Sequence, residues 1–109
     1  INAMQTHFGT SPANCLAHLG PSIQKCCYTV SATLADKFER AFGPHVRSEG
    51  DRLNLQRANV QQLLQAGVRP HAISVSYLCT ACRTDVFYSH RAEGGPTGRM
   101  LSLIRLHGN

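Results

Sequence analysis

Several features are missing from this sequence. It has no run of about 18 apolar residues, so we expect no membrane-spanning segment. No basic stretch followed by an apolar one opens the chain, and we expect no secretory signal. The motifs G-x-S-x-G, H-E-x-x-H and G-x-G-x-x-G do not occur, so no common hydrolase, zinc-protease or dinucleotide site is indicated.

Acidic residues are scarce. The 109 residues include 6 Asp and Glu against 11 Lys and Arg, which gives a formal net charge of +5. Such an excess is typical of nucleic-acid or phosphate partners. The basic residues are scattered singly, however, and nucleic-acid binding is not expected. The charge suits a small anionic co-substrate.

The five cysteines are an odd number, and Cys26 and Cys27 are adjacent. This pattern does not resemble the disulfide framework of a secreted protein, and we expect a reduced, cytoplasmic chain. Cys79 and Cys82 stand at C-x-x-C spacing, but a closed structural zinc site needs four ligands. Cys26 and Cys27 could supply the other two, although neighbouring side chains of an extended segment point opposite ways. A redox pair is also conceivable, but the residues after Cys82 are poor helix formers. We therefore favour semi-buried thiols, with zinc as the minor alternative.

The length suits one domain, and the apolar periodicities alternate between helix and strand. A helix over residues 1–8 ends at Gly9 without a visible start, so we expect the C-terminal part of a longer protein. The other elements expected are strands at 15–19, 72–78, 87–89 and 100–106, helices at 31–42 and 55–66, and polar loops at 45–52 and 93–98. His18 falls in the first of these strands and is expected to be a core residue. The fold class predicted is α/β (α+β), a mixed sheet flanked by helices.

Residues beside the glycine-rich 93–98 turn are the candidates for a binding site. His90 follows a predicted strand, and loops at strand ends often carry function. Arg91 and Arg99 bracket the turn, where a guanidinium fork can hold phosphate oxygens. Ser89 completes the set of substrate or phosphate candidates. A solvated surface pair is the commoner meaning of two such arginines, and the turn lacks the Gly-Lys-Ser/Thr ending of a P-loop.

Several phrases in order across the chain are similar to one family. They are L-G-P-S-I at 19–23, C-C-Y-T-V at 26–30, L-C-T at 78–80, F-Y-S-H-R at 87–91 and T-G-R-M-L-S-L-I at 97–104. These phrases resemble the YfiH or laccase-domain family, also described as multicopper polyphenol oxidoreductase laccases, peptidoglycan editing factors and purine nucleoside phosphorylases. The resemblance implies a single α/β domain whose sheet is flanked by helices.

The resemblance also implies an activity. It suggests part of a zinc-dependent purine nucleoside phosphorylase and adenosine deaminase that acts on adenosine, inosine or methylthioadenosine with phosphate. Arg91 and Arg99 would then hold phosphate or substrate, and replacing Arg91 by Ala should raise the KM for phosphate. The alternatives are a copper-dependent polyphenol oxidase, and a stand-alone zinc- or nucleic-acid-binding module built on the cysteines.

The family's metal ligands, a His, a Cys in a T-x-D-C phrase and a His in an H-A-G-W-R-G phrase, are not in this chain. The resemblance therefore implies that residues 1–109 form the C-terminal portion of one domain, inactive alone, with the ligands upstream of Ile1. The family often has a second arginine where this chain has Ala92, which puts a role for that arginine in doubt. Cys79 belongs to the L-C-T phrase and is expected to line a cleft or pack. An isolated chain is expected to self-associate or to pair with the missing portion.

Overall fold

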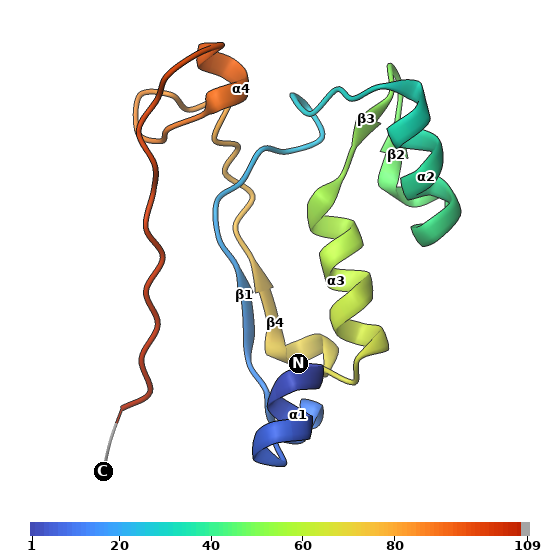
Figure 1. Ribbon diagram of the computed structural model, residues 1–109, viewed down its shortest axis with the longest axis vertical. Coiled ribbons are helices and arrows are strands. Elements are labelled where there is room, and N and C mark those ends of the chain that lie inside the picture. Colours follow the sequence, from blue (N-terminus) through green and yellow to red (C-terminus); the bar gives the residue numbers. More distant parts are fainter. Residues whose placement is uncertain (108–109) are drawn as a thin grey trace.

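The computed structural model describes residues 1–107 of the chain. Short helices and strands alternate along it (Figure 1). The α-helices are α1 (Asn2–Phe8), α2 (Ala32–Phe42), α3 (Leu55–Gln65) and α4 (His90–Glu93). The strands are β1 (Ala17–Leu19), β2 (Arg47–Ser48), β3 (Arg52–Leu53) and β4 (Ile73–Val75). Single 3-10 turns at Pro12–Asn14, Pro44–Val46 and Pro70–Ala72 connect them. The α/β class predicted from sequence is confirmed.

The helices begin and end where their capping residues predict. The Ser31 hydroxyl accepts the Leu34 N–H at 3.2 Å, and the Asn54 side chain accepts the Arg57 N–H at 3.0 Å. Each side chain satisfies one of the N–H groups that a first turn leaves unpaired. Gly9 ends α1 in the left-handed conformation, at φ 64°, which glycine adopts at little cost.

The strands form two separate pairs. β1 and β4 are parallel, with His18 opposite Ser74, and β2 and β3 form an antiparallel hairpin. The hairpin is a correction, because residues 45–52 were expected to be a loop. Arg47 explains it in part: its guanidinium binds Asp36 and Glu39 on α2 and Asp51 in the hairpin turn, at 2.6, 2.8 and 2.5 Å. These ion pairs tie the hairpin to α2.

Two further expectations about strands are wrong. Residues 87–89 lead into α4, and residues 100–106 are not in any strand. Leu101, Leu103 and Ile104 are 81, 87 and 97% exposed. A strand needs a neighbour for its backbone groups, and none of the described residues pairs with this segment. His18 is likewise exposed rather than in the core, and its ring bonds Ser74 Oγ at 2.8 Å.

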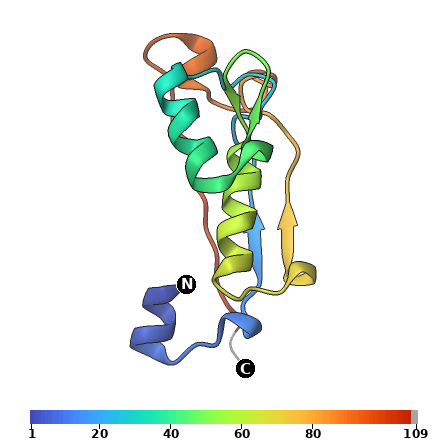
Figure 2. The ribbon, with the colours of Figure 1, turned by 90° about the vertical axis from the view of Figure 1, so that its right-hand side faces the viewer.

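The buried core is small for the length of the chain. It consists of apolar residues from α2, α3, the hairpin and three connections, namely Ala35, Val46, Leu53, Ala58, Val68 and Cys79. The radius of gyration is 16.0 Å, against about 13 Å for a compact domain of this length. Figure 2 shows the elongated outline, with α1 at one end and α4 at the other. None of the described helices is long and apolar enough to cross a membrane.

Candidate functional site

The candidate residues after position 88 lie around the short helix α4. Ser89 is buried and acts as the N-cap, because its hydroxyl accepts the Ala92 N–H at 3.2 Å. Gly94 ends the helix at φ 65°. The Ser89 hydroxyl therefore shapes the start of α4, and its O–H group can still donate a hydrogen bond. The sequence pattern missed this helix because four residues carry almost no periodicity.

Arg91 turns toward the preceding part of the chain. Its guanidinium donates to the Thr29 carbonyl at 2.5 Å and lies over the Tyr28 ring, 5.1 Å from the centroid. A cation over an aromatic face is attracted by the ring's electron density. Arg91 thus fastens α4 to the C-C-Y-T-V segment.

His90 and Arg99 line one open hollow of about 500 Å³ with Tyr88 and the 96–100 loop. The Thr97 hydroxyl in this loop is buried and has no hydrogen-bond partner among the described residues. Buried hydroxyls without partners are uncommon, and a shift of the loop would be needed for this one to reach an occupant of the hollow. The structure therefore brings His90 and Arg99 together and directs Arg91 elsewhere.

The Tyr88 ring explains why the T-G-R phrase has a glycine at position 98. A Cβ built at this position would lie 2.5 Å from the Tyr88 ring, closer than any side chain tolerates. The missing side chain lets the loop pass over the ring and places Thr97 and Arg99 on the same hollow. Neither this contact nor the Thr97 hydroxyl was recognised from sequence, because both depend on the path of the loop.

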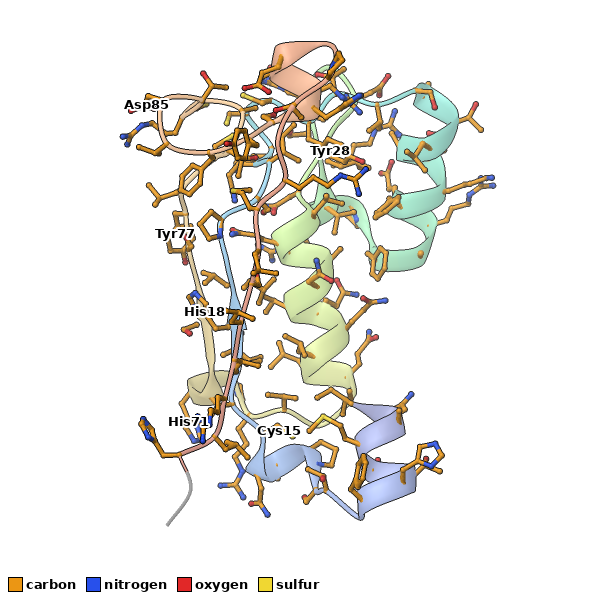
Figure 3. The ribbon with its side chains drawn as sticks, turned by 60° about the vertical axis from the view of Figure 1, so that its left-hand side comes forward. Cys15, His18, Tyr28, His71, Tyr77 and Asp85 are labelled. Carbon is orange, nitrogen blue, oxygen red and sulfur yellow. The ribbon has the colours of Figure 1, made fainter. Side chains whose placement is uncertain are left out.

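Four cysteines converge at the end of the molecule that carries α4. The Sγ atoms of Cys26, Cys27, Cys79 and Cys82 all lie within 4.8 Å of one another. The yellow sulfur atoms gather between the labelled Tyr28 and Asp85, whereas Cys15 lies at the opposite end (Figure 3). The expectation that Cys26 and Cys27 point opposite ways is wrong, because residues 25–27 form a turn rather than an extended segment.

The thiols of this cluster have unequal acidities. Hydrogen bonding to Cys82, followed by that to Cys26, raises the pKa of the Cys27 thiol to about 12. Burial raises the pKa of Cys79, but bonds from the Gln24 and Cys82 amides outweigh it and lower that pKa to about 6. Cys79 is therefore a stronger acid than Cys27, because backbone N–H groups point at its sulfur.

Together these features define part of an α/β domain. It carries a hollow lined by basic side chains, whose form depends on Gly98, and a cluster of four thiols. A family model described as multi-copper polyphenol oxidoreductase laccase matches residues 1–107, and the chain belongs to this family.

The relatives of this chain carry a phosphorylase name. The chain is 39% identical to "Purine nucleoside phosphorylase YlmD" of Geobacillus stearothermophilus, across 92% of this chain and 39% of that protein. It is 29% identical to human "Purine nucleoside phosphorylase LACC1", across 97% of this chain and 26% of that protein. The chain thus spans about two fifths, or less, of these relatives.

Two solved structures share the fold. The crystal structure of YlmD from Geobacillus stearothermophilus aligns with a TM-score of 0.76 at 36% identity, covering 88% of this chain and 38% of that one. The Bacillus licheniformis YfiH protein aligns with a TM-score of 0.71 at 33% identity, covering 86% and 38%. The α/β arrangement of residues 1–107 is therefore that of this family.

Proposed function

We propose that the chain supplies the phosphate-binding part of a purine nucleoside phosphorylase. The hollow supports this best, because it brings together the Arg99 guanidinium and the His90 imidazole. These are donors that suit the oxygens of a phosphate dianion. The names of the relatives, purine nucleoside phosphorylases, support the same reaction class. Adenosine, inosine and methylthioadenosine are the nucleosides that the family resemblance suggests.

The proposed chemistry needs a held and oriented phosphate. In phosphorolysis a phosphate oxygen bonds to C1′ of the ribose, the bond from C1′ to the purine nitrogen breaks, and the base leaves with a proton. The products are the free purine and ribose 1-phosphate. Arg99 contributes by binding the dianion through paired N–H donors, and His90 by a further donor on the same wall. Adenosine deamination stays a prediction of the resemblance, and a cytoplasmic location stays a prediction from the cysteine pattern.

The metal implied by the resemblance does not fit the residues described here. Its ligand set is His, Cys and His, whereas the four cysteines are the only grouping of three or more His, Cys, Asp or Glu residues within 1–107. No step of the reaction is assigned to a metal held by these residues, and the same donor set offers no histidine cluster for copper.

The first test is Arg99→Ala in the chain joined to the upstream portion that its relatives possess. We expect the KM for phosphate in inosine phosphorolysis to rise about 10- to 100-fold, because a hydrogen bond to a charged group contributes ~1.5–3 kcal/mol. The KM for inosine should change little. Arg69→Ala is the matched control, since Arg69 is exposed and distant from α4 in the sequence. An unchanged KM for phosphate would exclude Arg99 from this role.

Arg91→Ala separates direct binding from support. The contacts with Thr29 and Tyr28 predict lower thermal stability around α4. If Arg91 also binds the phosphate, as the sequence suggested, the Arg91→Ala variant will also have a higher KM for phosphate. An unchanged KM with a lowered Tm would leave Arg91 with the supporting role alone.

A further inference from the structure

The sulfur cluster has the dimensions of a metal site. Cys82 Sγ lies 3.5 Å from Cys26 Sγ and 3.4 Å from Cys27 Sγ, and Cys26 and Cys27 Sγ are 3.6 Å apart. With Zn–S bonds of ~2.3 Å, the sulfurs of a tetrahedral site lie about 3.8 Å apart. Small shifts of exposed side chains would bring all four sulfurs onto the corners of such a tetrahedron.

The backbone holds the two pairs of cysteines together. Ser22 and Cys79 form a parallel bridge in which the Thr80 N–H donates to the Ser22 carbonyl at 3.1 Å. On one side, the Cys27 N–H bonds the Gln24 carbonyl at 3.0 Å and closes the 25–27 turn. On the other, the Arg83 N–H bonds the Cys79 carbonyl at 3.1 Å and closes the C-x-x-C turn. The ligands are therefore preorganised by two turns that are more than fifty positions apart in the sequence.

The surroundings of the cluster suit thiolates. The Gln24 N–H points at Cys79 Sγ, 3.4 Å away, a contact that commonly orients the ligands of metal sites. Lys25 and Arg83 directly flank the ligands in sequence, and the Arg83 guanidinium is paired with the Asp85 carboxylate at 3.0 Å. Simple packing does not account for the arrangement, because Cys26 and Cys82 are both exposed. One disulfide would use only two of the four sulfurs.

We propose that Cys26, Cys27, Cys79 and Cys82 bind one zinc ion in a closed, structural site. The ligands are four soft sulfur donors in a tetrahedral arrangement, the set that selects zinc. On binding, the thiol protons are released to solvent and four Zn–S bonds form, with no change of oxidation state. These ligands differ from the His, Cys and His that the family resemblance implies.

The location suggests what the metal stabilises. Tyr28 and Thr29, which hold Arg91 and through it α4, follow Cys27 directly. α4 begins with His90, which lines the hollow. A zinc ion would therefore fix the platform under the hollow by clamping the C-C-Y-T segment to the C-x-x-C turn.

The test is metal binding by the reduced, zinc-depleted chain. Native mass spectrometry should show one zinc per chain, and Co²⁺ should give the thiolate charge-transfer bands and intense visible bands of a tetrahedral sulfur site. Cys26→Ser and Cys82→Ser each remove an exposed ligand. Loss of a residue that only orients a ligand lowers metal affinity roughly 10- to 100-fold, and we expect each of these variants to lose more zinc affinity than that. Cys15→Ser, far from the cluster, should bind as the parent does.

Three results would overturn the site. The first is that the reduced chain binds no zinc. This holds for a chain that is already folded, and for an unfolded chain whose circular dichroism shows no gain of structure when zinc is added. The second is zinc bound with equal affinity by the Cys26→Ser and Cys82→Ser variants, which would mark an adventitious ion. The third is a Co²⁺ spectrum without thiolate bands. Because every readout is binding or spectroscopy, failure here is distinguishable from failure of the proposed phosphorylase activity.

Discussion

At the scale of single residues, the candidate site depends on small features of the 88–99 segment. Gly98 is the clearest, because its lack of a side chain admits the Tyr88 ring. Arg91 and Arg99 look equivalent in sequence, but the first binds a backbone carbonyl and the second lines the hollow. The roles we propose for them therefore differ: Arg91 supports α4, and Arg99 binds phosphate.

Gly98→Ala should displace the Tyr88 ring and reshape the hollow. Because Tyr88 is 53% exposed, the ring can swing outward, and we expect a loss of stability below ~1 kcal/mol rather than the ~1–3 kcal/mol of overpacking in a closed core. The Tyr88 ring resonances should shift in NMR spectra. Gly95→Ala is the control, since a Cβ there meets nothing within 4 Å. Unchanged Tyr88 resonances would contradict the contact.

At the scale of elements, the helices α1, α2 and α3 and the strands β1 and β4 were predictable, whereas α4 and the β2–β3 hairpin were not. Ser31 and Asn54 cap α2 and α3 through bonds to residues three positions ahead, which are local in sequence. The β2–β3 hairpin instead depends on Arg47, whose partners include α2 residues. The polar sequence of residues 45–52 alone therefore could not predict the hairpin.

Ser31→Ala should lower the free energy of unfolding by about 1 kcal/mol, because the Leu34 N–H loses its acceptor. Urea unfolding followed by circular dichroism measures the change. Ser102→Ala, in the exposed C-terminal segment, is the control and should leave the midpoint unchanged. Equal effects from the two variants would show that the cap does not contribute.

At the scale of the whole molecule, many large apolar side chains are exposed and few are buried in the core. The 101–106 segment runs back along the long axis, apart from the β1–β4 pair (Figure 1), and its leucine and isoleucine side chains are almost fully exposed. We propose that a further part of the family domain covers it. Without that cover, exposed apolar patches and unpaired strand edges promote association.

Replacing Leu101, Leu103 and Ile104 together by Lys should reduce self-association of the isolated chain. Sedimentation velocity at several concentrations measures the effect, and we expect the parent to form larger species as concentration rises. A variant with Lys at the exposed positions 5, 6 and 14 adds the same charge elsewhere and should associate like the parent. A parent that stays monomeric at all concentrations would contradict this prediction.

The sequence by itself determined the helices α1, α2 and α3, their caps and the family, because these rest on hydrogen bonds a few residues apart and on contiguous phrases. Only the tertiary structure decided which functional side chains meet. Cys26 and Cys27 face Cys82 because a turn and a backbone bridge at Ser22 fold two distant segments together. Arg99 joins His90 because Gly98 lets the loop cross Tyr88. Such meetings depend on the path of the whole chain, which no local pattern encodes.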